Sequence, residues 1–179
     1  MARNVEIKAR IAGSTGIDRL APRVAALAQH GPELIVQDDS FFACAQGRLK
    51  LRDFGNGRGE LIAYERPDAP GPKTSAYLIT PTADPDGLRA TLARALGHAG
   101  RVKKQRLLYL VGRTRVHLDR VDGLGEFLEL EVVLRDGEPA EAGIEEAHAL
   151  LARLGVAPEQ WVAGAYVDLL RAQAGGAAR

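Results

Sequence analysis

The sequence predicts an α+β fold, namely a closed antiparallel β-barrel with a charged interior, flanked by helices. Segments that alternate polar and apolar residues outnumber the helical ones, and the polar side of the alternation is almost purely ionic. One such strand would fit a half-exposed sheet, whose solvent face normally also contains neutral polar residues. Clustered charges are costly unless they face a ligand or one another. A sheet closed with its ionic face inward satisfies that condition, and small barrels can hold a ligand.

The alternation places strands along nearly the whole chain. The segment 4–11 alternates strictly, and Asp122-Gly123 marks a tight turn between the last two strands. The segment 67–73, PDAPGPK, has the composition of a loop. The expected strands are 4–11, 34–42, 48–53, 60–66, 77–80, 102–111, 113–121 and 126–134.

Helical patterns separate these strands or follow them. Gly31-Pro32 should end the first helix, and Asp84-Pro85 should begin the second. The expected helices are 18–29, 85–96, 138–154 and 163–170. We expect one domain over residues 1–172 and a flexible tail over 173–179.

The composition limits the location and the partners. With 179 residues, 46% of them hydrophobic, the chain can bury one ordinary core. A net charge of +1 disfavours binding to nucleic acid or to an anionic membrane. Only one cysteine, Cys44, is present, and the first residues have no apolar stretch typical of a signal peptide. We therefore expect a cytoplasmic protein without a membrane or nucleic-acid partner.

The ionic faces predict the kind of ligand. Cations share one face on three predicted strands, and carboxylates gather on the first strand and the last two. Guanidinium groups suit phosphate because they donate paired hydrogen bonds. Carboxylates would repel phosphate unless Mg²⁺ or Mn²⁺ bridged them. The residues that share these faces are Arg48, Lys50 and Arg52; Lys104 and Arg106; Arg113, Arg115, His117 and Asp119; and Glu129 and Glu131.

Several segments resemble the CYTH superfamily, the triphosphate tunnel metalloenzymes. They are NVEIK at the N-terminus, GRLKLR, YERPDAPGPKTSAY, the segment 102–134 and AYVDLL. The segment 102–134 is similar in particular to class IV adenylate cyclases. The resemblance implies a metal-dependent nucleotidyl cyclase that converts ATP to cyclic AMP and pyrophosphate. Two alternatives stay open: a triphosphatase acting on an organic or inorganic triphosphate, and a non-catalytic protein that binds triphosphate or polyphosphate. Relatives also suggest a homodimer.

The resemblance also implies roles for individual residues. The implied catalytic residues are Glu6, Lys8, Lys104 and Asp119. The implied triphosphate-binding residues are Lys8, Arg10, Arg48, Lys50, Arg52, Lys104, Arg106, Arg113 and Arg115. The implied ligands of Mg²⁺ or Mn²⁺ are Glu6, Asp119, Glu129 and Glu131.

Two positions depart from the family pattern. Asn4 stands where the first glutamate of the ExExK signature is expected, so one metal would lose a charged ligand. Glu65 occupies the position of a phosphate-binding lysine, and the adjacent Arg66 would face the opposite side of the strand. His117 could accept a proton or be a hydrogen-bonded structural histidine.

Overall fold

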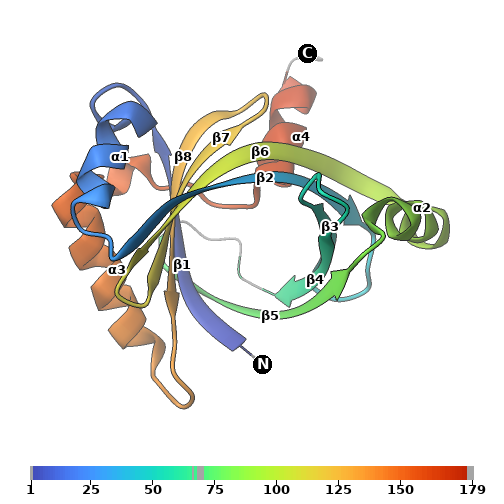
Figure 1. Ribbon diagram of the computed structural model, residues 1–179, viewed down its shortest axis with the longest axis horizontal. Helices are drawn as coiled ribbons and strands as arrows, with labels where there is room; N and C mark the ends of the chain where they lie inside the picture. Colours follow the sequence, from blue (N-terminus) through green and yellow to red (C-terminus); the bar gives the residue numbers. More distant parts are fainter. Residues whose placement is uncertain (1, 66, 68–70, 177–179) are drawn as a thin grey trace.

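Eight antiparallel strands form a closed barrel, which confirms the predicted fold class. The computed structural model describes residues 2–65, 67 and 71–176. Neighbouring strands follow the order β1-β5-β4-β3-β2-β6-β7-β8, and β8 pairs with β1 to close the ring (Figure 1). The strands are β1 (Ala2–Ile11), β2 (His30–Phe42), β3 (Arg48–Asp53), β4 (Gly59–Glu65), β5 (Lys73–Thr82), β6 (His98–Val111), β7 (Thr114–Val121) and β8 (Gly125–Val133).

Some strands extend further than local sequence indicates. β5 begins at Lys73, inside the segment expected as a loop, because its backbone pairs with both β1 and β4. β2 begins at His30, which pairs with Leu110 of the long strand β6. In both cases pairing with neighbouring strands outweighs the glycines and prolines of the segment. Arg66 lies outside the described residues.

Two 3-10 turns and four helices complete the described part of the fold. In α2 the carboxylate of Asp84 accepts a hydrogen bond from the backbone N–H of Gly87 at 2.9 Å, as the predicted helix start requires. α4 extends through 173–176, part of the expected tail, whereas 177–179 lie outside the described residues. The helical segments are Gly13–Thr15, α1 (Ile17–Ala25), α2 (Pro85–Leu96), α3 (Ala140–Leu154), Pro158–Gln160 and α4 (Tyr166–Gly176).

The main apolar core lies outside the barrel. Figure 1 shows α1 and α3 together on one side of the ring, where they cover the outer face of β1, β7 and β8. Ile7, Leu118 and Leu130 point outward into this core and are fully buried, each contributing about 1.5–3 kcal/mol through burial. The apolar side of each alternating strand therefore packs against helices, and its ionic side faces the interior.

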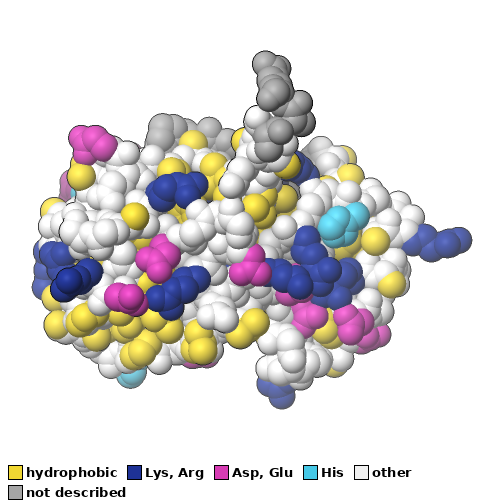
Figure 2. Space-filling view, turned by 90° about the horizontal axis from the view of Figure 1, so that it is seen from above, with side chains coloured by type: hydrophobic (Ala, Val, Ile, Leu, Met, Phe, Trp, Pro, Cys, Tyr) yellow, Lys and Arg dark blue, Asp and Glu magenta, His cyan; other side chains and the backbone are white. Residues whose placement is uncertain are grey.

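One face of the outer surface carries charges of both signs. On the face seen in Figure 2, positive and negative side chains lie interspersed among neutral ones. Leu34 and Leu78, on the outer face of β2 and β5, are 63% and 60% exposed. Within the described residues, no helix combines the length and apolarity needed to cross a bilayer.

Candidate active site

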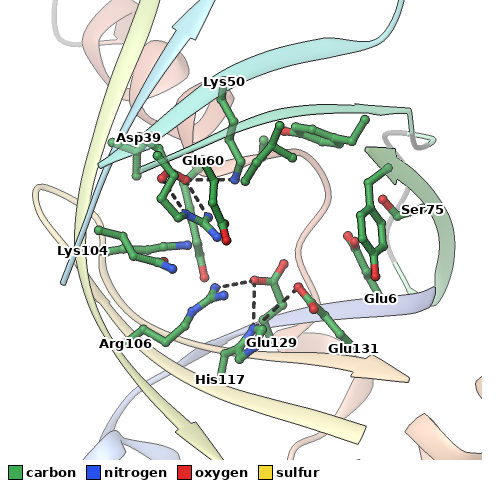
Figure 3. A pocket seen from close by; sticks show the side chains of 18 of the residues that line it. Glu6, Asp39, Lys50, Glu60, Ser75, Lys104, Arg106, His117, Glu129 and Glu131 are labelled. Atoms are coloured by element: carbon green, nitrogen blue, oxygen red, sulfur yellow. Dashed lines mark hydrogen bonds and ion pairs between the residues drawn. The ribbon is translucent and has the colours of Figure 1, made fainter. Parts of the chain in front are cut away.

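The barrel encloses a cavity of about 360 Å³ that is lined by all eight strands and by the start of α4. Most of its charged groups come from the inward faces of β1, β3, β6, β7 and β8. Figure 3 shows these side chains pointing toward the common space. The ionisable side chains that line it, tyrosines aside, are Glu6, Lys8, Asp39, Lys50, Arg52, Glu60, Lys104, Arg106, Arg115, His117, Glu129 and Glu131.

One cluster of charges joins β2 and β3 around Asp39. This carboxylate accepts hydrogen bonds from Arg52 at 2.8 Å, from both Nε and Nη2, and from Lys50 Nζ at 2.9 Å. Burial alone would raise the pKa of Asp39, but Arg52 and Lys50 together hold it well below its usual value. The sequence analysis did not select Asp39, although the alternation of its strand places it on the inward face with Gln37 and Phe41.

A second cluster joins β6, β7 and β8 around Arg106. Its guanidinium donates to both oxygens of Asp119 at 2.7 Å and to Glu129 at 2.9 Å. Asp119 is fully buried and also accepts from the Tyr166 hydroxyl at 2.9 Å, with Lys104 Nζ 3.4 Å away. Asp119 therefore lies behind Arg106 and does not line the cavity, so it holds cations in place rather than contacting a ligand directly.

Lys8 is held at the end of the cavity beside α4. Its ammonium lies 3.9 Å from the centre of the Tyr166 ring and donates to the carbonyl of Gly164 at 3.3 Å. Lys104 lies 4.9 Å from the same ring. Tyr166 thus positions both lysines that were expected to act in catalysis, although the sequence alone gave Tyr166 no such role.

Three side chains form a group that could hold a divalent cation. Ligand atoms of His117, Glu129 and Glu131 all lie within 4.8 Å of one another. Glu6 stands beside Glu131 across the β1–β8 pair and also lines the cavity. Carboxylate oxygens suit Mg²⁺ or Mn²⁺, and Mn²⁺ also accepts an imidazole nitrogen.

Two buried polar atoms near this group support the fit. Nδ1 of His117 and Oδ1 of Asn4 have no hydrogen-bond partner among the described residues. Nδ1 lies 3.8 Å from a carboxylate oxygen of both Glu129 and Glu131. Burial and then Arg106 lower the pKa of His117, which keeps the imidazole neutral and able to ligate. The donor set therefore fits a divalent cation, and Asn4 adds an amide oxygen at the position where a glutamate was expected.

Three predicted phosphate-binding arginines do not line the cavity. Arg10 is exposed and donates to the carbonyl of Leu124 at 2.6 Å. Arg48 forms an ion pair with Asp168 of α4 at 2.6 Å. Arg113 lies in the turn before β7 and pairs with Glu138 and Glu146 at 2.5 and 2.8 Å. Alternation predicts which face of the strand a side chain occupies, but not how far along the barrel axis it lies from the cavity. The predicted placement of these three arginines in the cavity was therefore wrong.

The remaining predicted residues converge in one space or directly behind it. Glu65 is exposed at the end of β4, and the inward positions of this strand are Glu60, Ile62 and Tyr64. β4 therefore contributes no cation to the cavity. The predicted residues that line the cavity are Glu6, Lys8, Lys50, Arg52, Lys104, Arg106, Arg115, Glu129 and Glu131.

Comparison with known proteins identifies the family. The model of the CYTH domain matches residues 2–166. The chain belongs to the CYTH domain family. A search among curated proteins finds no match.

Solved structures of this fold align over almost the whole CYTH domain. The PH1012 protein from Pyrococcus horikoshii OT3 is 23% identical and superposes with a TM-score of 0.80, over 93% of this chain and 98% of its own. A Vibrio parahaemolyticus protein, whose name assigns it provisionally to the adenylate cyclases, is 21% identical over 94% and 97% of the two chains, with a TM-score of 0.73. The Mimivirus capping enzyme triphosphatase is 8% identical over 86% and 89%, with a TM-score of 0.56. These similarities show the common fold.

Lys50 should make phosphate binding in the cavity depend on pH. Burial, followed by the charge of Arg52, lowers the pKa of Lys50 to about 8, and Asp39 opposes the shift. Lys50 therefore loses its charge between pH 7 and 9.5, so metal-free tripolyphosphate should bind less tightly at the higher pH. We expect a loss on the order of tenfold in titration calorimetry. Lys50→Arg keeps its charge and should lose clearly less affinity over this pH range. An equal loss of affinity in both proteins would show that Lys50 does not cause the pH dependence.

Proposed function

We propose that this CYTH domain binds ATP and a divalent cation in the barrel cavity and converts ATP to cyclic AMP and pyrophosphate. The observation that carries the proposal is the convergence of six cations and four glutamates on one enclosed space. The cations are Lys8, Lys50, Arg52, Lys104, Arg106 and Arg115, and the glutamates are Glu6, Glu60, Glu129 and Glu131. The similarity to a structure named among the adenylate cyclases supports this reaction over others.

In the proposed reaction the ribose 3′ oxygen forms a bond to the α-phosphorus, and the bond from that phosphorus to the pyrophosphate oxygen breaks. The 3′ hydroxyl releases its proton to solvent water, and pyrophosphate leaves with the electron pair of the broken bond. Arg52 and Arg106 donate hydrogen bonds to the departing phosphates, where charge develops. Glu6, Glu129 and Glu131 would hold Mg²⁺ or Mn²⁺, which supplies charge neutralisation and lowers the proton affinity of the hydroxyl.

Ion pairing among the cavity-lining side chains is consistent with this role. Arg106 pairs with Glu129, and Arg115 pairs with Glu131 at 2.7 Å. When a triphosphate binds, its phosphates would replace the glutamates as partners of the arginines. A divalent cation would replace the arginines as the partner of the glutamates, so no charged group would lose its counter-charge. A cytoplasmic location and a homodimeric assembly belong to the same proposal.

Hydrolysis is the second candidate, because the Mimivirus triphosphatase shares the fold. Water would then attack the γ-phosphorus in the same cavity. Phosphorus NMR of the products formed from ATP with Mn²⁺ separates the two reactions. Cyclic AMP with pyrophosphate is the expected result. Orthophosphate with ADP would show that the protein hydrolyses ATP and does not cyclise it. Tight binding without any product would instead favour a non-catalytic binder, an alternative consistent with the uncharged Asn4 in place of a metal-binding glutamate.

A further inference from the structure

The two ends of the cavity differ in chemistry. At the end covered by α4, Phe41, Val102 and Phe127 point into the interior and form a buried apolar cluster with Tyr166. These side chains fill the barrel beside Lys8 and Lys104. A ligand therefore enters from the opposite end.

The strand directions identify the residues at that open end. On β3, Arg48 contacts α4, and Phe54 follows six residues later, a distance of roughly 20 Å along a strand. Glu60, the second residue of β4, lies at the same end, opposite Arg52, because β4 runs antiparallel to β3. Ile79 pairs opposite Ile62 and is 48% exposed although it lines the cavity. Phe54, Glu60 and Ile79 thus form the mouth.

The wall made by β4 and β5 lacks cations at the lining positions. Its side chains there are Glu60, Ile62, Tyr64, Ser75, Tyr77 and Ile79. A phosphate chain gains nothing from this wall, because apolar surfaces and a carboxylate do not compensate its charge. The wall instead offers apolar and aromatic surface, which suits a planar organic group.

Glu60 is the polar group of this wall that a ligand would meet first. It is half-buried and points into the cavity (Figure 3). Among the described residues, its carboxylate has no hydrogen bond or ion pair, in contrast to Asp39, Glu129 and Glu131. An ionised carboxylate only accepts hydrogen bonds, so its partner must carry N–H or O–H groups.

We propose that the mouth is a nucleobase site, in which a base packs against Phe54 and Ile79 and donates its N–H groups to Glu60. This inference rests on the proposed function, since it assigns the organic part of the triphosphate. The substrate class is a nucleoside triphosphate whose base lies at the mouth and whose phosphates lie deeper among the cations. Inorganic tripolyphosphate would use only the deeper part.

The test compares ATP with inorganic tripolyphosphate in EDTA, where neither is turned over. Glu60→Gln should weaken ATP binding about tenfold, because a charged acceptor becomes a neutral one. The same variant should leave tripolyphosphate binding unchanged or tighter, because it removes a negative charge. Glu65→Gln, on the same strand but exposed, is the matched control and should change neither constant.

A second pair of variants tests the apolar wall. Ile79→Ala should weaken ATP binding several-fold, the loss expected when about one to two buried methylene groups are removed. The affinity for tripolyphosphate should not change. The neighbouring Leu78→Ala faces outward and should do nothing to either ligand. If Glu60→Gln alters both ligands by the same factor, or leaves ATP unaffected, the nucleobase site is wrong. If the wild type binds neither ligand, the proposed function fails and this inference fails with it.

Discussion

Replacing Arg106 with alanine should lower the free energy of unfolding by about 3–5 kcal/mol at pH 7. The guanidinium compensates Asp119 and Glu129, which are 0% and 7% exposed, and alanine would leave both charges in the interior. Urea denaturation followed by circular dichroism measures the loss. Arg101→Ala is the matched control on the same strand: its pair with Asp38 is as short, at 2.6 Å, but the two side chains are 47% and 22% exposed, so about 1 kcal/mol or less is expected.

The pH dependence of this loss tests its electrostatic origin. Burial alone would raise the pKa of Asp119 and Glu129, but Arg106 at Asp119, and Lys8 together with Arg106 at Glu129, hold both pKa values below their usual range. These carboxylates therefore bind protons less readily in the folded protein than in the unfolded chain. Their contribution to stability is therefore present above the unfolded pKa, about 4, and is lost as the pH falls below it. The difference between wild type and Arg106→Ala should shrink in acid. A difference that stays constant from pH 7 to 3 would show that lost packing, and not charge, causes the destabilisation.

The ring of strands could be predicted from the sequence because the polar positions of the alternating strands are almost purely ionic, which is unusual for a solvent-exposed sheet face. Alternation between ionic and apolar residues fixes the side of each strand, and helices had to cover the apolar side. Glu129 and Arg106 were placed correctly for this reason. The same rule could not give position along the barrel axis, so Arg10, Arg48 and Arg113 were expected in a cavity that they do not line.

Other features depend on partners distant in the sequence. Tyr166 contacts Asp119 and Lys8 through the path of α4 across one end of the barrel, which no local pattern specifies. Asp39 acquires its cations from the neighbouring strand β3. The wall of β4 and β5, which has no cation among its cavity-lining side chains, follows from the pairing of these two strands, and the sequence analysis had assigned β5 only a short segment.

Glu129→Gln should separate the two roles of the cavity, phosphate binding and metal binding. Glutamine keeps the shape of Glu129 and a hydrogen-bond acceptor for Arg106 but removes the negative charge. Arg106 and Lys8 are then less neutralised, so metal-free tripolyphosphate should bind more tightly than to the wild type. The additional affinity that Mn²⁺ gives should fall at least ~10–100-fold, and turnover of ATP should fall with it. Titration calorimetry with and without Mn²⁺ measures both constants.

Opposite signs in the two titrations distinguish this interpretation from simple damage to the fold. A loosened barrel would bind tripolyphosphate less tightly with and without Mn²⁺. Loss of one negative ligand should instead raise the metal-free affinity and lower the affinity that Mn²⁺ adds. Glu65→Gln removes the same charge from an exposed position and should leave both constants at their wild-type values. If Glu129→Gln keeps the full effect of Mn²⁺, the cation is not held by the group of His117, Glu129 and Glu131, and the carboxylates serve only as counter-ions for the arginines.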